Sequence, residues 1–237
     1  MDFDKISEIR VAWNNFLTQK SETISQMQIR AAGIHESVNQ KYDELPYSFH
    51  TNMVSNFFMQ YAPDCFLDYN EYANIIQSDG LAAIFGAIFH DTIEDCRLTY
   101  NDVVNIAIRY MGKAQAELAA DIVYALTNEK GKTRDERAND RYYQGILNTP
   151  YAPCIKLCDR YANSIYAVSR KSSMAKKYAT EMKHFIGQIM RRDDSKYMLP
   201  NDLVRLCLSY PLCTGNETIC EDLKILAELK RQLASSK

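Results

Sequence analysis

The sequence predicts an all-α fold, and three observations carry this expectation. Apolar residues recur at helical spacing in several long segments, beginning with Phe3, Ile6 and Ile9. No segment alternates polar and apolar residues over the length of several strands. The 237 residues are 46% hydrophobic and 24% charged, which is typical of a globular domain rather than of a disordered chain.

The N-terminal region is expected to be a long helical stretch followed by a loop. Residues 3–30 form the first expected helix, and residues 31–41 continue in the same style. His35 lies on this polar continuation, so we expect a surface or only partly packed histidine. Residues 42–50 (YDELPYSFH) are expected to form a short loop that leads into a helix, with Pro46 in the first turn, where its missing N–H does no harm.

An apolar run, Leu81–Asp95 (LAAIFGAIFHDTIED), is the most informative stretch of the chain. It is expected to be a helix that ends near Asp91 and delivers a histidine and three carboxylates at one end. If the helix continues, His90 and Glu94 lie one turn apart, as do Asp91 and Asp95. Burying charge is costly unless the charge is paired or bound to a metal. The run therefore predicts a metal-centred active site.

The region after this run combines a helix signal with a dense charge cluster. Thr99 and Asp102 have the spacing of a capping box, so a helix is expected to begin there. Gly112 predicts a break, and residues 114–126 predict a further helix. Residues 127–141 (TNEKGKTRDERANDR) permit two interpretations, a solvated surface segment or a set of cations for an anionic ligand. The cations concerned are Lys130, Lys132, Arg134, Arg137 and Arg141.

The C-terminal third is expected to be helical as well. Residues 153–167 (PCIKLCDRYANSIYA) predict a helix with Asp159 beside its apolar stripe. A carboxylate in that position needs a partner. Asn163 lies one turn further along the same face. Residues 171–237 read as two or three more helices. The clearest of these are at about residues 175–191 and 217–233.

Charge and cysteine content exclude several functional classes. The net charge is −2 with no long basic run, which argues against a dedicated nucleic-acid binder. No apolar run is long enough to span a bilayer, and the N-terminus lacks the pattern of a signal peptide. The seven cysteines are therefore expected to be reduced thiols of a cytoplasmic protein.

Two imidazoles and two carboxylates form a candidate metal site. The four candidate ligands are His50, His90, Asp91 and Asp159. This set suits Mn²⁺, Zn²⁺ or Fe²⁺ better than Ca²⁺ or a thiolate site. A metal ion lowers the pKa of its bound water, and a nearby carboxylate can orient that water or move its proton. Glu94 and Asp95 are the nearest such carboxylates, so the sequence predicts a hydrolase.

The order and rough spacing of the four candidate ligands are similar to those of the HD superfamily of metal-dependent phosphohydrolases. Within that superfamily, three segments resemble the SpoT-like alarmone hydrolases. PYSFH at 46–50, FHDTIED at 89–95 and KLCDRYAN at 156–163 are similar to the family motifs PYxxH, LHDxxEDT and KLADxxxN. The resemblance covers roughly residues 30–170.

The resemblance implies an HD-type helical bundle in which the four candidate ligands hold one Mn²⁺. Glu94 and Asp95 would then handle the attacking water and its proton, and Asn163 would help to hold the substrate or its sugar. The other substrate contacts that it implies are Lys41 near the base and Lys130 and Arg137 at the phosphates.

The resemblance also implies a reaction and a domain layout. The family reaction removes the 3′-pyrophosphate of guanosine tetra- or pentaphosphate. Residues 31–170 would form the HD core, preceded by an N-terminal helix at 1–30 and followed by a helical extension at 171–237, all within a single domain. Two other functions stay open: an HD nucleotidase or phosphodiesterase acting on another nucleotide, and a nucleotide-binding protein with an inactive site.

Overall fold

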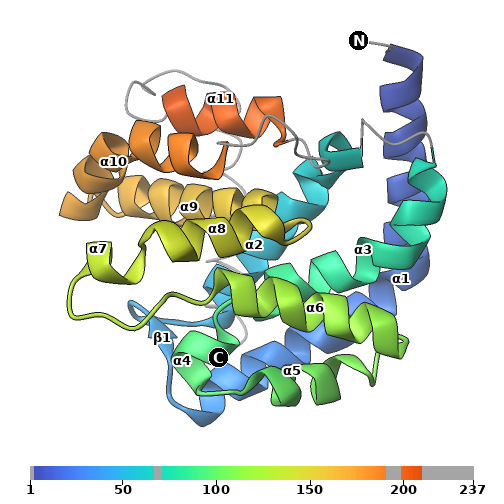
Figure 1. Cartoon of the computed structure of the whole chain (residues 1–237), viewed down its shortest axis with the longest axis horizontal. Helices are drawn as coiled ribbons and strands as arrows, with labels where there is room; N and C mark the ends of the chain where they lie inside the picture. Colours follow the sequence, from blue (N-terminus) through green and yellow to red (C-terminus); the bar gives the residue numbers. More distant parts are fainter. Residues whose placement is uncertain (1–2, 67–70, 191–198, 210–237) are drawn as a thin grey trace.

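The predicted all-α fold is confirmed in the computed structural model, which describes residues 3–66, 71–190 and 199–209 (Figure 1). In chain order the helices are α1 (Phe3–Ser37), α2 (Ser48–Tyr61), the 3₁₀ helix η1 (Ala62–Phe66), α3 (Tyr72–Phe89), α4 (Thr92–Cys96), α5 (Tyr100–Ala107), α6 (Lys113–Leu126), α7 (Arg134–Arg137), α8 (Asp140–Asn148), α9 (Ala152–Ser169), α10 (Ser173–Ile189) and α11 (Asn201–Ser209). Two short antiparallel strands, β1 (Lys41–Tyr42) and β2 (Leu45–Pro46), form a hairpin before α2.

Helix α3 lies at the centre of the fold. Every residue from Gly80 to Phe89 is buried, because α1, α2 and α6 pack around this part of the helix. A helix that is apolar on all sides must be covered on all sides, and this explains the uninterrupted apolar run. The stacked rings of Phe85 and Phe89, with centroids 3.9 Å apart, extend the packing to the end of α3. The core thus fixes the point at which His90 leaves the helix.

Helices α2 and α9 pack against each other beside α3. The rings of Phe57 and Tyr161 meet at this contact, with centroids 5.0 Å apart. Helix α10 covers another face of α9, where the guanidinium of Arg160 lies over the ring of Phe185 and pairs with Glu181. These contacts bring the first turn of α2 and the middle of α9 close to the end of α3.

The first expected helix and its expected continuation form one helix that runs without a break to Ser37. Two other expectations for the N-terminal region were wrong. The segment that follows contains the hairpin, so Pro46 lies in β2 and α2 begins only at Ser48. His35 is buried, with 1% of its surface exposed, because α1 packs against α3 and α4 on this side.

Other local expectations were confirmed. Thr99 and Asp102 form a capping box at the start of α5, and Gly112 is the N-cap of α6. Helix α8 had not been predicted as a separate element. The helix expected at residues 217–233 lies outside the described residues.

The cysteines of the described segments are free thiols and all of them are buried: Cys65, Cys96, Cys154, Cys158 and Cys207.

Candidate metal centre

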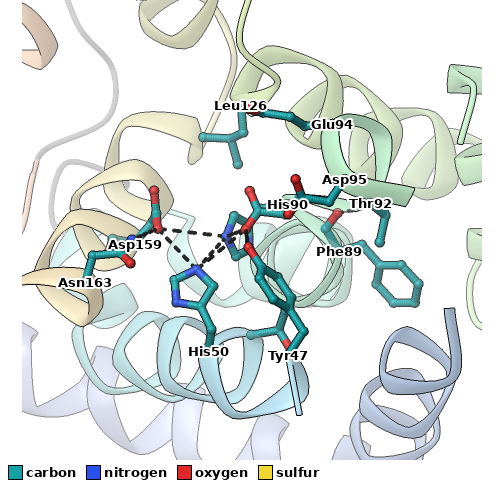
Figure 2. Close-up of polar contacts among 12 residues, drawn as sticks. Tyr47, His50, Phe89, His90, Thr92, Glu94, Asp95, Leu126, Asp159 and Asn163 are labelled. Carbon is teal, nitrogen blue, oxygen red and sulfur yellow. Dashed lines mark hydrogen bonds and ion pairs between the residues drawn. The ribbon is translucent and has the colours of Figure 1, made fainter. Parts of the chain in front are cut away.

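Three parts of the fold bring the candidate ligands together (Figure 2). His50 comes from the first turn of α2, and His90 and Asp91 occupy the break between α3 and α4. The Nε2 atoms of the two histidines are 3.3 Å apart. Asp91 places Oδ2 2.8 Å from Nε2 of His90 and 3.5 Å from Nε2 of His50. Each of these three residues thus offers a ligand atom within 4.8 Å of the other two, which is close enough for one metal ion.

Asp159 approaches the same two histidines from α9. Its Oδ1 is 3.3 Å from Nε2 of His50 and 3.9 Å from Nε2 of His90. Figure 2 shows these contacts running from Asp159 to both rings. The carboxylate is almost buried, with 9% of the residue exposed. The four residues that were expected together from the sequence therefore face one another, although they span 110 positions of the chain.

The orientation of His90 suits metal ligation. Its Nδ1 is 2.9 Å from the carbonyl oxygen of Ala87 in the preceding turn. Since a carbonyl can only accept a hydrogen bond, Nδ1 must carry the proton. In the neutral ring, Nε2 then presents its lone pair to the cluster. A backbone contact of this kind is the usual way in which proteins set the tautomer of a ligating histidine.

The electrostatics of the cluster favour a cation. Burial alone would lower the pKa of His50, but hydrogen bonds with Asp159 and Asp91 outweigh it and raise this pKa to about 9. Burial would raise the pKa of Asp159, yet the charge of Lys156 and the His50 hydrogen bond hold it below its usual range. Burial would also raise the pKa of Asp91, but electrostatic attraction to His90 and a separate hydrogen bond with His50 hold it well below its usual range. Both carboxylates therefore stay ionised, and positive charge among them is stabilised.

The donor set fits a borderline divalent ion. Two imidazole nitrogens and two carboxylate oxygens suit Mn²⁺, Fe²⁺ or Zn²⁺, and no described thiol lies within the cluster. The surroundings also fit, since ligating carboxylates normally accept further hydrogen bonds from outside the ligand set. Tyr47 donates its hydroxyl to Oδ2 of Asp91 at 2.6 Å, and Asn163 donates Nδ2 to Oδ1 of Asp159 at 2.6 Å.

Glu94 and Asp95, the predicted catalytic pair, lie beside the cluster in α4. Although α3 ends before His90, Asp91 and Asp95 lie one helical turn apart as expected, because the N–H of Asp95 donates to the carbonyl of Asp91 at 2.8 Å. Glu94 is exposed and lies near Leu126 in Figure 2. Its carboxylate accepts from Nδ2 of Asn128 at 2.9 and 3.0 Å. Glu94 is thus tied to the segment that follows α6.

Asp95 is the more enclosed member of the pair. Its Oδ2 accepts from Nε2 of Gln40 at 3.2 Å. Burial and the nearby charge of Asp91 raise the pKa of Asp95 to about 6. A carboxyl that titrates near neutral pH is suited to accept and release a proton during a reaction.

Three of the expected substrate contacts stand apart from the cluster. Lys41, Lys130 and Arg137 are exposed. In the described parts of the chain, none of them forms a hydrogen bond or ion pair with the four candidate ligands. The carbonyl of Arg137 accepts from the N–H of Glu129 at 3.1 Å, which closes the charged segment into a loop. Their predicted roles at the base and phosphates stay predictions.

Several residues of the site were not expected from the sequence. Tyr42 in β1 stacks on His50, with centroids 4.8 Å apart, and donates its hydroxyl to Oδ1 of Asn163. Lys156 donates to Oδ2 of Asp159 at 2.9 Å. A signal existed for Lys156, which lies three residues before Asp159 on a helix and therefore on the same face. No sequence pattern connects Tyr42 with Asn163, 121 positions away.

No family model and no curated protein matches the sequence. The candidate metal centre is therefore defined by its geometry and chemistry. Among the described helices, none combines the length and the apolar character that crossing a membrane requires.

Proposed function

We propose that this protein is a metal-dependent phosphohydrolase of the HD type, acting on a nucleoside polyphosphate. The observation that carries the proposal is the convergence of His50, His90 and Asp91 on one point, with Asp159 facing them from α9. The sequence motifs led us to expect two histidines, His50 and His90, with Asp91 directly after His90 at the end of a helix. The all-α architecture of the described residues, with its single short hairpin, supports the proposal, because the HD superfamily is expected to be all-α.

The proposed roles follow from the positions of the side chains. The four candidate ligands would hold one Mn²⁺, with Fe²⁺ or Zn²⁺ as alternatives. A divalent ion supplies Lewis-acid polarisation of a phosphate and lowers the pKa of a water molecule. Asp95 would take a proton from the attacking water, and Glu94 would orient that water or the substrate. Tyr42 and Asn163 would form the side of the site nearest the hairpin.

The favoured substrate is guanosine tetra- or pentaphosphate, with release of pyrophosphate from the 3′ position. This choice rests on the three motif segments around His50, the His90-Asp91 pair and Asp159. The exposed cations Lys130 and Arg137 belong to a flanking segment that would meet the more distant phosphates.

Product analysis on a panel of nucleotides with Mn²⁺ tests the proposal. The panel contains guanosine tetraphosphate, nucleoside triphosphates, nucleoside monophosphates and cyclic or linear phosphodiesters, and the products are separated by ion-exchange chromatography. His90→Gln is the control for contaminating phosphatases, because it removes a ligand and keeps the rest of the site. Pyrophosphate and GDP from the tetraphosphate, formed by the wild type only, support the proposal.

The other outcomes separate the alternatives. Turnover of monophosphates or phosphodiesters alone would keep the HD chemistry and replace the substrate. Tight Mn²⁺ binding without turnover of any nucleotide would indicate a nucleotide-binding protein with an inactive site. A wild-type protein that binds no divalent metal would overturn the proposal altogether.

A further inference from the structure

Lys156 is a cation held inside the candidate metal centre. It lies on α9 one turn before Asp159, and 15% of its side chain is exposed. Its Nζ is 2.9 Å from Oδ2 of Asp159 and 5.8 Å from the centre of the Tyr142 ring. Placing an ammonium group in so enclosed a position is costly unless the charge has a purpose or a partner.

The two oxygens of Asp159 face different partners. Oδ1 points toward the histidines and accepts from Asn163, whereas Oδ2 accepts from Lys156. A metal ion among the candidate ligands would use Oδ1. Lys156 can therefore keep its contact with Oδ2 while the metal is bound. An ammonium group has three N–H donors. Asp159 accepts one of them and the Tyr142 side chain forms a second hydrogen bond with it, so a third donor remains for a ligand that enters beside the metal.

The charge balance of the site explains why a cation there is useful. Two neutral imidazoles and two carboxylates with a divalent ion have no net charge. The nearby carboxylates of Glu94 and Asp95 would then repel a phosphate. Lys156 adds one positive charge next to the metal without adding a ligand, and this charge offsets part of the repulsion. A lysine serves here as a compact point charge for phosphate, and its partner Asp159 fixes its position.

We propose that Lys156 is a substrate-binding residue, which donates to a phosphate oxygen of the substrate next to the metal. The inference deepens the proposed phosphohydrolase function and rests on it. It assigns the cation nearest the reacting phosphate to α9, inside the site. The exposed charged segment at residues 127–141 would then serve only the more distant phosphates. The competing explanation is that Lys156 merely neutralises Asp159.

The test uses the full-length protein with Mn²⁺ and inorganic pyrophosphate as the probe. Mn²⁺ affinity is measured first by titration calorimetry, and pyrophosphate affinity is then measured on the Mn²⁺-loaded protein. Lys156→Met removes the charge and keeps most of the aliphatic stem, and Lys156→Arg keeps the charge. Arg160→Met is the matched control, because Arg160 is a similarly buried cation on the same helix that pairs with Glu181 on α10.

Lys156→Met is expected to weaken pyrophosphate binding by about 10- to 100-fold, the usual effect of losing a charge-assisted hydrogen bond. Its Mn²⁺ affinity is expected to be unchanged or higher, since a positive charge near the metal is gone. Lys156→Arg should keep most of the pyrophosphate affinity, and Arg160→Met should keep all of it. Circular dichroism melts show whether each variant is folded.

Two results would overturn the inference. Wild-type pyrophosphate affinity in folded Mn²⁺-loaded Lys156→Met would show that the lysine only neutralises Asp159. Equal losses in Lys156→Met and Arg160→Met would show a general effect of destabilising α9. A wild-type protein that binds no Mn²⁺ would instead overturn the proposed function, and with it this inference.

Discussion

At the scale of single residues, Asp159 connects the candidate metal centre with its surroundings. It faces both histidines through one oxygen and Lys156 through the other. Asp159→Asn removes the negative charge and is expected to weaken Mn²⁺ binding by more than about 100-fold. The reason is that loss of an outer-shell partner alone typically costs 10- to 100-fold in metal affinity, so the loss of a ligand should exceed this range.

Titration calorimetry with Mn²⁺ checks this expectation. Asp140→Asn is a suitable control, because Asp140 is an exposed carboxylate in the first turn of α8. Wild-type affinity in Asp159→Asn would remove Asp159 from the ligand set and leave a three-residue site.

The acidic pair in α4 is expected to behave differently from the ligands. Asp95→Asn and Glu94→Gln should each keep Mn²⁺ binding and lower kcat by about 10²- to 10⁴-fold, the usual contribution of a general acid or base. Steady-state rates at saturating Mn²⁺ measure the loss, and calorimetry measures the metal. Should Mn²⁺ binding vanish in either variant, that residue is a ligand and its assignment as a catalytic group is wrong.

Three of the four candidate ligands could be proposed from sequence on local grounds, whereas His50 was included only in combination with the other three. His90 and Asp91 end an apolar run, and Asp159 interrupts an apolar helix face. The contact of Tyr42 with His50 had no such signal, because it depends on a hairpin of two-residue strands. His35 was misjudged for a related reason. Its neighbours in sequence are polar, and its burial is decided by α3 and α4.

At the scale of elements, the packing of α3 against α6 holds the end of α3 in place. Gly86 makes this close approach possible. A Cβ atom at this position would overlap the Cγ2 methyl of Ile122 and lie 3.1 Å from its Cβ. Because Ile122 is β-branched and stiff in a helix, it cannot turn aside easily. Gly86→Ala is therefore expected to lower the free energy of unfolding by about 1–3 kcal/mol, as overpacked cores do.

Urea denaturation of the metal-free protein measures this change. Gly33→Ala is the matched control, since a Cβ there meets nothing within 4 Å near the C-terminal end of α1. That variant should be neutral or more stable by up to about 1 kcal/mol. The double variant Gly86→Ala/Ile122→Ala should be less destabilised than the sum of its two single variants. Simple additivity would mean that the two side chains do not compete for space.

The helices themselves were the most predictable elements. Thr99 and Asp102 form the capping box that marks the start of α5, and Gly112 precedes α6 as expected. The hairpin at residues 41–46 could not be predicted, because two-residue strands are too short to show an alternating pattern. Pro46 was assigned to a helix because proline is favourable both in the first turn of a helix and in an edge strand, so its presence did not distinguish the two.

At the scale of the whole molecule, the long helix α1 links folding stability to pH through His35. This histidine lies where α1 packs on α4, with its Nδ1 3.1 Å from Sγ of Cys96 and its ring stacked on Tyr47. Burial lowers the pKa of His35 to about 4, although the charge of Asp91 partly opposes the shift. The folded protein therefore keeps this ring neutral in a range where the unfolded chain binds a proton.

The sign of the effect follows from proton binding. Well above pH 6.5 the ring is neutral in both states and has no effect on stability. Between pH 6.5 and about 4 the unfolded state binds more protons, so the free energy of unfolding falls as the pH falls. One such group contributes a slope of at most about 1.4 kcal/mol per pH unit. His35→Asn removes this group while keeping a polar side chain of similar reach beside Cys96.

Urea denaturation in EDTA at several pH values between 4.5 and 7.5 should therefore give a shallower stability profile for His35→Asn than for the wild type. Subtracting one stability profile from the other removes the contributions of groups that titrate equally in both proteins and leaves the contribution of His35. Parallel profiles would mean that the His35 ring has the same pKa in the folded and the unfolded state. Because α1 packs on α4, which carries Glu94 and Asp95, protonation of His35 at low pH is expected to destabilise a contact beside the candidate metal centre.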